Sequence, residues 1–122
     1  VFGEYYHKEF DTYQTESSII EKLIKSKAPG FSYTIVLGTW CGDTKREVPR
    51  MLKVLSEIGV EMAGIHLIAV DTRKQAPGTG LESLNIMKVP TLIVFHSEVE
   101  IGRIIETPVK SIEEDLLKIL DQ

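Results

Sequence analysis

A strand–helix–strand pattern between residues 32 and 71 constrains the fold of this chain more than any other feature. The run SYTIVLG, residues 32–38, is β-branched, aromatic and bounded by glycines, which predicts a buried strand. From residue 43 to 58 apolar residues recur at helical spacing until Gly59 ends the run. IHLIAVD, residues 65–71, predicts a second strand. Because a helix separates the two strands, we expect them to be parallel, with a right-handed crossover.

Ahead of this unit the sequence predicts a helix and a lead-in segment. Ser18 and Glu21 have the spacing of a capping box, and apolar residues then follow one face until Pro29, which predicts a helix over about 18–27. Residues 1–17 show no clean period, and we expect them to pack onto the domain through their aromatic side chains: Phe2, Tyr5, Tyr6, Phe10 and Tyr13.

Three further elements are predicted after the second strand. Thr79 and Glu82 stand at capping-box spacing, which indicates a short helical turn. Residues 91–105 hold two strand-like runs joined by polar residues, which is typical of an antiparallel hairpin. Ser111 and Glu114 predict the start of a last helix. This order predicts an α/β fold with a mixed four-stranded sheet and helices on both faces.

Composition excludes several classes of protein. The 122 residues are 43% apolar and 26% charged, as in one globular domain. The net charge is −4 and no basic stretch is longer than a pair such as Lys45–Arg46, which argues against a nucleic-acid partner. The longest apolar runs are far shorter than the roughly 20 residues that span a bilayer, so no membrane association is expected. The three histidines are scattered without ligand spacing, so we expect no metal site and no cofactor.

Cys41 is the only cysteine in the chain, so it cannot form a disulfide within its own chain. It is predicted to follow a strand and to precede a helix, where unpaired N–H groups and the helix dipole favour a thiolate. Thr44, three residues on, could donate a hydrogen bond to the sulfur, and Lys45 could add a positive charge, whereas Asp43 opposes it. The alternative is that Cys41 is a small semi-buried residue without chemistry.

The segment TWCGDTKREVP, residues 39–49, resembles the active-site turn of the thioredoxin superfamily. There a tryptophan precedes a Cys-Gly-Pro-Cys motif and a proline follows eight residues after the first cysteine. Farther on, MKVPTLIVF resembles the family's Ile-Pro-Thr segment, whose cis-proline faces the cysteine. The resemblance runs from about residue 32 to the C-terminus and implies a single thioredoxin-like domain over 1–122. The matching positions are Trp40, Cys41, Gly42, Pro49, Val89, Pro90 and Thr91.

The resemblance also implies roles for these residues. Cys41 and Thr44 would be catalytic. Val89 would hold the backbone of a partner in a short β-pairing, and Pro90 would keep Val89 aimed at the cysteine. The remaining substrate-binding residues implied are Trp40, as the wall of the groove, together with Gly42 and Thr91.

Three departures from the family pattern limit what can be carried over. The resolving cysteine is replaced by Thr44, so the two-step reduction by a dithiol is unavailable. The buried acid six residues before the first cysteine is replaced by Ile35. The glycine in the loop after the last strand is replaced around residues 106–108.

Three functions stay open at this point. In the favoured one, a monothiol redox protein, Cys41 forms mixed disulfides with protein or low-molecular-weight thiols and an external thiol resolves them. The second is a non-catalytic binding module that uses the same groove. The third, cluster binding like that of monothiol glutaredoxins, is disfavoured because their Cys-Gly-Phe-Ser motif is absent. Whether the protein is an enzyme, and its oligomeric state, stay undetermined. One cysteine favours a cytoplasmic location, and the start at Val1 leaves export open.

Overall fold

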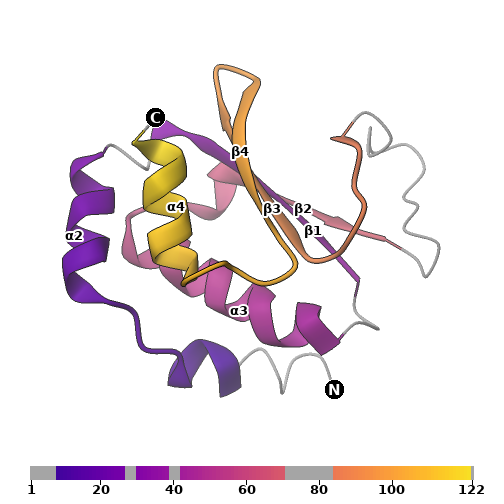
Figure 1. The fold of residues 1–122 in the computed structure, drawn as a ribbon, viewed down its shortest axis with the longest axis horizontal. Helices are drawn as coiled ribbons and strands as arrows, with labels where there is room; N and C mark the ends of the chain where they lie inside the picture. The colour runs from indigo at the N-terminus through magenta and orange to yellow at the C-terminus, as the bar shows by residue number, and fades with distance from the viewer. Residues whose placement is uncertain (1–7, 27–29, 39–41, 71–83, 122) are drawn as a thin grey trace.

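The computed structural model describes residues 8–26, 30–38, 42–70 and 84–121. A short helical segment over residues 8–12 precedes the labelled elements. In chain order these are α2 (Ser17–Lys25), β1 (Ser32–Leu37), α3 (Gly42–Glu57), the 3₁₀ turn η2 (Met62–Gly64), β2 (Ile65–Ala69), β3 (Thr91–His96), β4 (Val99–Ile105) and α4 (Ile112–Leu120) (Figure 1). No helix among the described residues is long and apolar enough to cross a membrane.

The four strands form one mixed sheet in the order β2-β1-β3-β4. β1 and β2 are parallel and are connected through α3, whereas β3 is antiparallel to both β1 and β4. The predicted strand–helix–strand unit, the hairpin and the mixed four-stranded sheet are therefore confirmed. The hairpin turns through Ser97 and Glu98, whose φ angles of 52° and 68° suit a type I′ turn and the twist of the strands.

The helices α2, α3 and α4 gather on one side of the sheet (Figure 1). Their apolar side chains form one core with the sheet residues that face them, and fully buried members include Leu23 of α2, Met51 of α3 and Leu116 of α4. On the opposite face a smaller core is formed by Val36, Ile68, Val70 and Val89. The short helical turn predicted from Thr79 and Glu82 lies outside the described residues, so helical covering is described for one face only.

The helix α3 matches its sequence prediction within one residue at each end. Its inward face is apolar, and Val48, Met51 and Leu55 are buried. Pro49 lies inside the helix, and Gly59, with a φ of 91°, follows its end in a conformation that favours glycine. Sequence periodicity sufficed here because the helix packs a whole stripe of apolar residues against the sheet.

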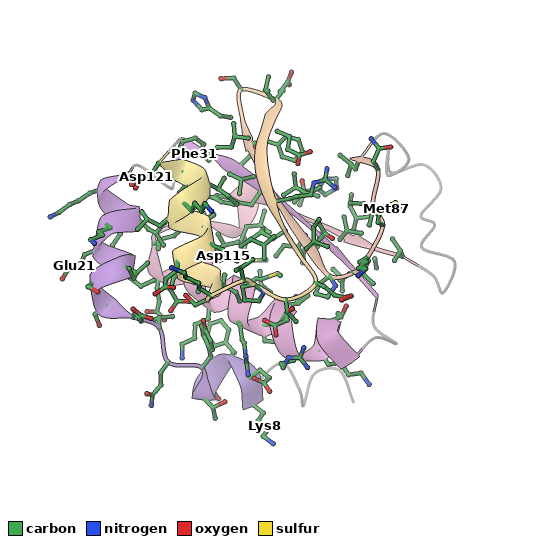
Figure 2. The ribbon with its side chains drawn as sticks, in the orientation of Figure 1. Lys8, Glu21, Phe31, Met87, Asp115 and Asp121 are labelled. Atoms are coloured by element: carbon green, nitrogen blue, oxygen red, sulfur yellow. The ribbon has the colours of Figure 1, made fainter. Side chains whose placement is uncertain are left out.

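Of the three predicted capping boxes, the two that lie among the described residues have different outcomes. At α4 the Ser111 hydroxyl accepts a hydrogen bond of 3.1 Å from the Glu114 N–H, as predicted. Just before this cap, the carboxylate of Asp115 (labelled in Figure 2) accepts the N–H groups of Val109 and Lys110 at 2.6 and 3.2 Å. Side chains of the first helical turn therefore fix the loop that enters α4.

The capping box predicted at Ser18 and Glu21 is wrong. The helix α2 begins at Ser17, its N-cap is Glu16, and no side chain caps it. The Glu16 N–H instead donates to the Glu113 carboxylate at 2.9 Å, and its carbonyl accepts from Ile19 and Ile20. A contact with α4 therefore fixes the start of α2.

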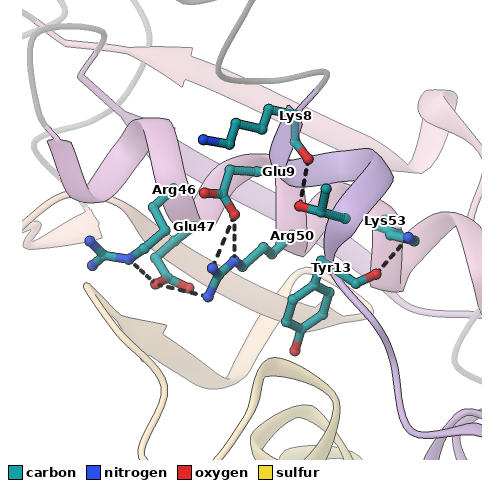
Figure 3. Close-up of polar contacts among 8 residues, drawn as sticks. Lys8, Glu9, Tyr13, Arg46, Glu47, Arg50 and Lys53 are labelled. Carbon is teal, nitrogen blue, oxygen red and sulfur yellow. Dashed lines mark hydrogen bonds and ion pairs between the residues drawn. The ribbon is translucent and has the colours of Figure 1, made fainter.

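Residues 8–16 are attached to α3 by polar contacts that Figure 3 shows. Arg50 forms an ion pair of 3.0 Å with Glu9, and Lys53 donates a hydrogen bond of 2.6 Å to the Tyr13 carbonyl. Phe10 and Tyr13 also pack against the main core. Phe2, Tyr5 and Tyr6, the other aromatic residues of the predicted lead-in, lie outside the described residues.

Candidate functional site

The first turn of α3 is tied to the end of β1 through Thr44. This residue is fully buried, and its Oγ1 accepts a hydrogen bond of 3.2 Å from the N–H of Gly38, directly after β1. The bond joins the two sides of residues 39–41. Trp40 and Cys41, the predicted groove wall and nucleophile, belong to those three residues and lie outside the described part of the chain.

The hydroxyl of Thr44 can also donate a hydrogen bond, besides the one that it accepts from Gly38. As an acceptor it uses an oxygen lone pair, so its own proton stays available for donation to a second group. Donation to the Cys41 sulfur, expected from the sequence, stays a prediction. The geometry adds that the Thr44 oxygen is held in place by the backbone at the end of β1.

Gly42 is the first residue of α3 and is exposed. A Cβ placed there would meet no atom within 4 Å. Packing therefore does not require a glycine at this position, and its predicted contact with substrate stays a prediction.

The segment before β3 forms a turn fixed at both ends. The Val89–Pro90 peptide bond is cis, and both residues are buried. The Thr91 hydroxyl donates a hydrogen bond of 2.6 Å to the Lys88 carbonyl, and the Pro90 carbonyl accepts one of 2.7 Å from the Glu106 N–H. Met87, 78% exposed, leads into this turn on the side of the molecule away from Glu21 of α2 (Figure 2).

The sheet register brings Thr44 and this turn to the same end of the molecule. Thr91 pairs with Val36 on β1 and with Ile105 on β4. Val36 lies two residues before Gly38, the partner of Thr44. Four of the predicted site residues, Thr44, Val89, Pro90 and Thr91, therefore lie around one end of β1 and β3, and Gly42 starts the adjoining helix.

Two of the departures from the family pattern have structural counterparts. Ile35 is fully buried in the main core, so an apolar side chain fills the position where the family has its acid. Glu106 has a φ of 63°, a left-handed conformation that is uncommon for residues other than glycine. The loop after β4 therefore makes its turn without the glycine.

Glu47 is a buried acid that the sequence analysis did not single out. The stretch from Lys45 to Glu47 has the pattern of a solvated helix face, but Glu47 is only 3% exposed. Its Oε2 accepts from Arg46 Nε at 2.8 Å and lies 4.0 Å from Arg50 Nη1, whereas Oε1 has no hydrogen-bond partner among the described residues (Figure 3). The available signal was its spacing, one helical turn before the buried Met51.

No metal site is formed by the described part of the chain, in which no group of three His, Cys, Asp or Glu side chains is placed to hold an ion. His66 and His96 are both exposed, and His7 lies outside the described residues.

Comparisons with known proteins give structural but not sequence relatives. No protein-family model matches the sequence, and no curated protein matches it significantly. A protein of unknown function from Pseudomonas aeruginosa is similar in structure, with a TM-score of 0.62 and 12% identity over 98% of this chain and 80% of that chain. Thioredoxin O1 from Arabidopsis thaliana has a TM-score of 0.51 and 20% identity over 90% of this chain and 93% of its own.

A third solved structure is similar to this chain to about the same degree as thioredoxin O1. Mitochondrial thioredoxin 3 from Saccharomyces cerevisiae has a TM-score of 0.50 and 17% identity, over 93% of this chain and 97% of its own. The chain has a thioredoxin-like fold. At these identities the likeness concerns the fold alone, so the chemistry of this thioredoxin-like domain has to be argued from its own residues.

Proposed function

We propose that this thioredoxin-like domain is a monothiol redox protein with Cys41 as its nucleophile. Cys41 is the residue directly before Gly42, where α3 begins. The free N–H groups and the positive dipole end of a helix N-terminus lower the pKa of a thiol placed there. The observation that carries the proposal is the fixed Thr44 hydroxyl, which accepts the Gly38 N–H and keeps its own proton for donation, at the position where the resemblance has the resolving cysteine.

The reaction is a thiol–disulfide exchange in two steps. The Cys41 thiolate attacks one sulfur of a substrate disulfide, that S–S bond breaks, and the other half leaves as a thiolate. The thiolate of an external low-molecular-weight thiol then attacks the substrate sulfur of the mixed disulfide and releases Cys41 as a thiolate. One disulfide is consumed and one is formed, so the external thiol is the single co-reactant.

Substrate binding would involve Trp40 and the turn at Val89 and Pro90. Val89 is only 4% exposed, so its side chain offers a partner little surface, and the resemblance implies that a partner pairs with its main chain. Main-chain recognition suits an extended segment of any sequence. The proposed substrates are therefore disulfides in extended protein segments and the oxidised, disulfide forms of low-molecular-weight thiols.

A specific observation favours a second candidate, a binding module without redox chemistry. Thr44 is fully buried and bonded to Gly38, so the first turn of α3 is stabilised without any second thiol. In that case the groove would be kept for a partner and Cys41 would be incidental. The two candidates differ in whether the function requires the sulfur.

The deciding experiment is the rate of Cys41 alkylation by iodoacetamide against pH, with the unfolded chain as reference. The redox proposal predicts a midpoint below the ordinary thiol pKa of about 8.5. Thr44→Val should move this midpoint upward because the hydroxyl donor is lost, and Thr44→Ser should keep it low. A midpoint at or above that of the unfolded chain would reject the redox proposal.

A second readout separates chemistry from binding. Incubation with glutathione disulfide should give a mixed disulfide at Cys41 by intact mass spectrometry, and added glutathione should reverse it. If the folded protein forms no such adduct, whereas the unfolded chain does, the binding module is the better description.

A further inference from the structure

Arg103 of β4 connects this strand to the segment that leads into the turn at Val89 and Pro90. Its Nη2 donates a hydrogen bond of 2.9 Å to the carbonyl of Leu84, and its Nη1 donates one of 3.5 Å to the carbonyl of Asn85. A guanidinium presents several donors in a rigid plane, so one side chain can hold two neighbouring carbonyls. Arg103 therefore attaches the start of this segment to β4.

The guanidinium is itself held by Glu100 of the same strand. Nε and Nη2 of Arg103 donate to the two carboxylate oxygens of Glu100 at 2.7 and 2.6 Å. Residues three apart on a regular strand point to opposite faces of the sheet. Arg103, however, pairs with Ile93 on β3. Glu100 pairs with Phe95, which lies on the same face as Ile93, because the pairing shifts by one residue between them. The bulge in β4 therefore places the carboxylate beside the guanidinium.

The other end of the segment is bonded to the residue directly after β4. The carbonyl of Pro90 accepts a hydrogen bond of 2.7 Å from the Glu106 N–H. Near the first attachment, Asn85 has a φ of 54°, a left-handed conformation that asparagine enters more readily than most residues. Residues 84–90 are thus attached at both ends, through Arg103 at the start and through Glu106 at the end.

We propose that Arg103, oriented by Glu100, is a positioning residue for the turn before β3. The inference rests on the proposed function, which assigns the turn at Val89 and Pro90 to the binding of an extended disulfide substrate. Arg103 would act through the turn and would not touch the substrate. Its effect is geometric, because a displacement of about 1 Å in a group that aligns the reactants can slow a reaction by about a hundredfold.

This role predicts a difference between two kinds of disulfide. A peptide disulfide has a main chain that can pair with the turn, whereas 2-hydroxyethyl disulfide has none. The proposed thiolate of Cys41 is stabilised at the start of α3, which does not belong to residues 84–90. Loss of the Arg103 attachment should therefore slow the reaction of Cys41 with the peptide and leave its reaction with the small disulfide unchanged.

The first test compares the two disulfides on Arg103→Lys, which keeps the positive charge but loses the planar fork. The peptide probe is short and unstructured, and its single cysteine is joined to 2-mercaptoethanol. Attack of the Cys41 thiolate on the peptide sulfur links protein and peptide and releases the 2-mercaptoethanol thiolate. Intact mass spectrometry over time gives each rate. We expect a fall of about tenfold for the peptide and a change below about twofold for 2-hydroxyethyl disulfide.

Two further variants control this comparison. Glu100→Gln keeps Arg103 but removes the charge that orients it, so it should give a smaller loss of the same kind, and it replaces Arg103→Lys if that variant does not fold. Arg50→Lys alters the ion pair of α3 with Glu9 and should change neither rate. An unchanged peptide rate in Arg103→Lys, an equal loss with both disulfides, or a matching loss in Arg50→Lys would overturn the proposal.

A second measurement does not depend on thiol chemistry. The Glu106 N–H is bonded to the Pro90 carbonyl, so its hydrogen exchange reports how firmly the turn is attached. In Arg103→Lys this exchange should be several-fold faster, while the Val70 N–H, bonded at 2.8 Å to the last residue of β1, should keep its rate.

The exchange rates also separate this inference from the proposed function. If the original protein reacts with neither disulfide, the proposed function fails, and hydrogen exchange alone decides whether Arg103 positions the turn. Faster exchange at Glu106 alone would support that role. An unchanged rate at Glu106, or a parallel change at Val70, would reject it.

Discussion

The Tyr13 hydroxyl donates a hydrogen bond of 2.5 Å to Oε1 of Glu113, a residue 100 positions later in the chain. Glu113 is only 1% exposed, and its other oxygen accepts the N–H of Glu16. A buried carboxylate is tolerated when its oxygens are hydrogen-bonded. Both donors come from the N-terminal segment, so this segment and α4 stabilise each other.

Tyr13→Phe should destabilise the protein by roughly 1–3 kcal/mol, because it leaves one oxygen of a buried carboxylate without a donor. Urea unfolding followed by circular dichroism would measure the change. Thr12→Val is the matched control, since the Thr12 hydroxyl bonds the Lys8 carbonyl at an exposed position. Equal effects of the two substitutions would show that the Tyr13–Glu113 bond contributes nothing specific.

Stability should fall as the pH rises above about 10, the ordinary pKa of tyrosine. Burial, followed by the hydrogen bond to Glu113, raises the pKa of Tyr13 in the folded protein, and burial raises that of Tyr33. Above pH 10 the unfolded chain therefore loses protons that the folded protein retains, which favours unfolding. Urea midpoints between pH 8 and 11 should decline less steeply for Tyr13→Phe than for the original protein. An identical slope would contradict this account.

The predicted caps at Ser111 and Ser18 allow a paired test of stability. Ser111→Ala should cost about 1 kcal/mol because the Glu114 N–H loses its acceptor. Ser18→Ala should change stability by less than about 0.5 kcal/mol, because α2 begins without a side-chain cap. Thermal and urea unfolding of the two variants would check the contrast. A larger loss at Ser18 than at Ser111 would mean that the caps are assigned the wrong way round.

Gly102 on β4 should not tolerate a side chain. A Cβ there would lie 2.8 Å from Cγ2 and 2.9 Å from Cγ1 of Ile119 on α4. Both atoms are bonded to the Cβ of Ile119, so a change of side-chain rotamer cannot move both of them away. Gly102→Ala should destabilise by about 1–3 kcal/mol through overpacking. In an Ile119→Ala background the same substitution should cost much less, and a double-mutant cycle would measure this coupling. Additive effects would exclude the contact as the cause.

The elements that the sequence predicts correctly are those whose signals are local. The helix α3 follows from apolar spacing that ends at Gly59, and the Ser111 cap lies within one helical turn of its partner Glu114. The start of α2 could not be predicted, because it depends on the Glu113 carboxylate, about a hundred positions away. Local patterns identify an element, and tertiary contacts then decide its ends.

In the candidate site, too, local motifs could be predicted from the sequence, whereas contacts between separate elements could not. The resemblance of residues 39–49 and 87–95 to the family motifs predicted that Thr44, Val89 and Pro90 lie near one another, because motif spacing reflects a shared fold. The bond from Gly38 to Thr44 and the bond from Glu106 to Pro90 could not be predicted, since each joins separate elements. The burial of Glu47 was missed because charge alone suggests a solvated face, whereas the packing around α3 decides which face is covered.

Glu47 should be replaceable by an apolar residue with a gain in stability. Its carboxylate is buried, and Oε1 has no hydrogen-bond partner in the described part of the chain, so the desolvation of the charge is only partly offset. Its partner Arg46 has a side chain that is 40% exposed, so the guanidinium stays in contact with solvent when this ion pair is lost.

Glu47→Met, which is similar in length, should therefore raise the free energy of unfolding by about 1 kcal/mol. Glu47→Gln is the control: it removes the charge but keeps a buried polar group, and it should give a smaller gain or none. Urea unfolding at pH 7 would measure both. If Glu47→Met instead loses more than about 1 kcal/mol, the carboxylate has a stabilising role in the folded protein that its described contacts do not account for.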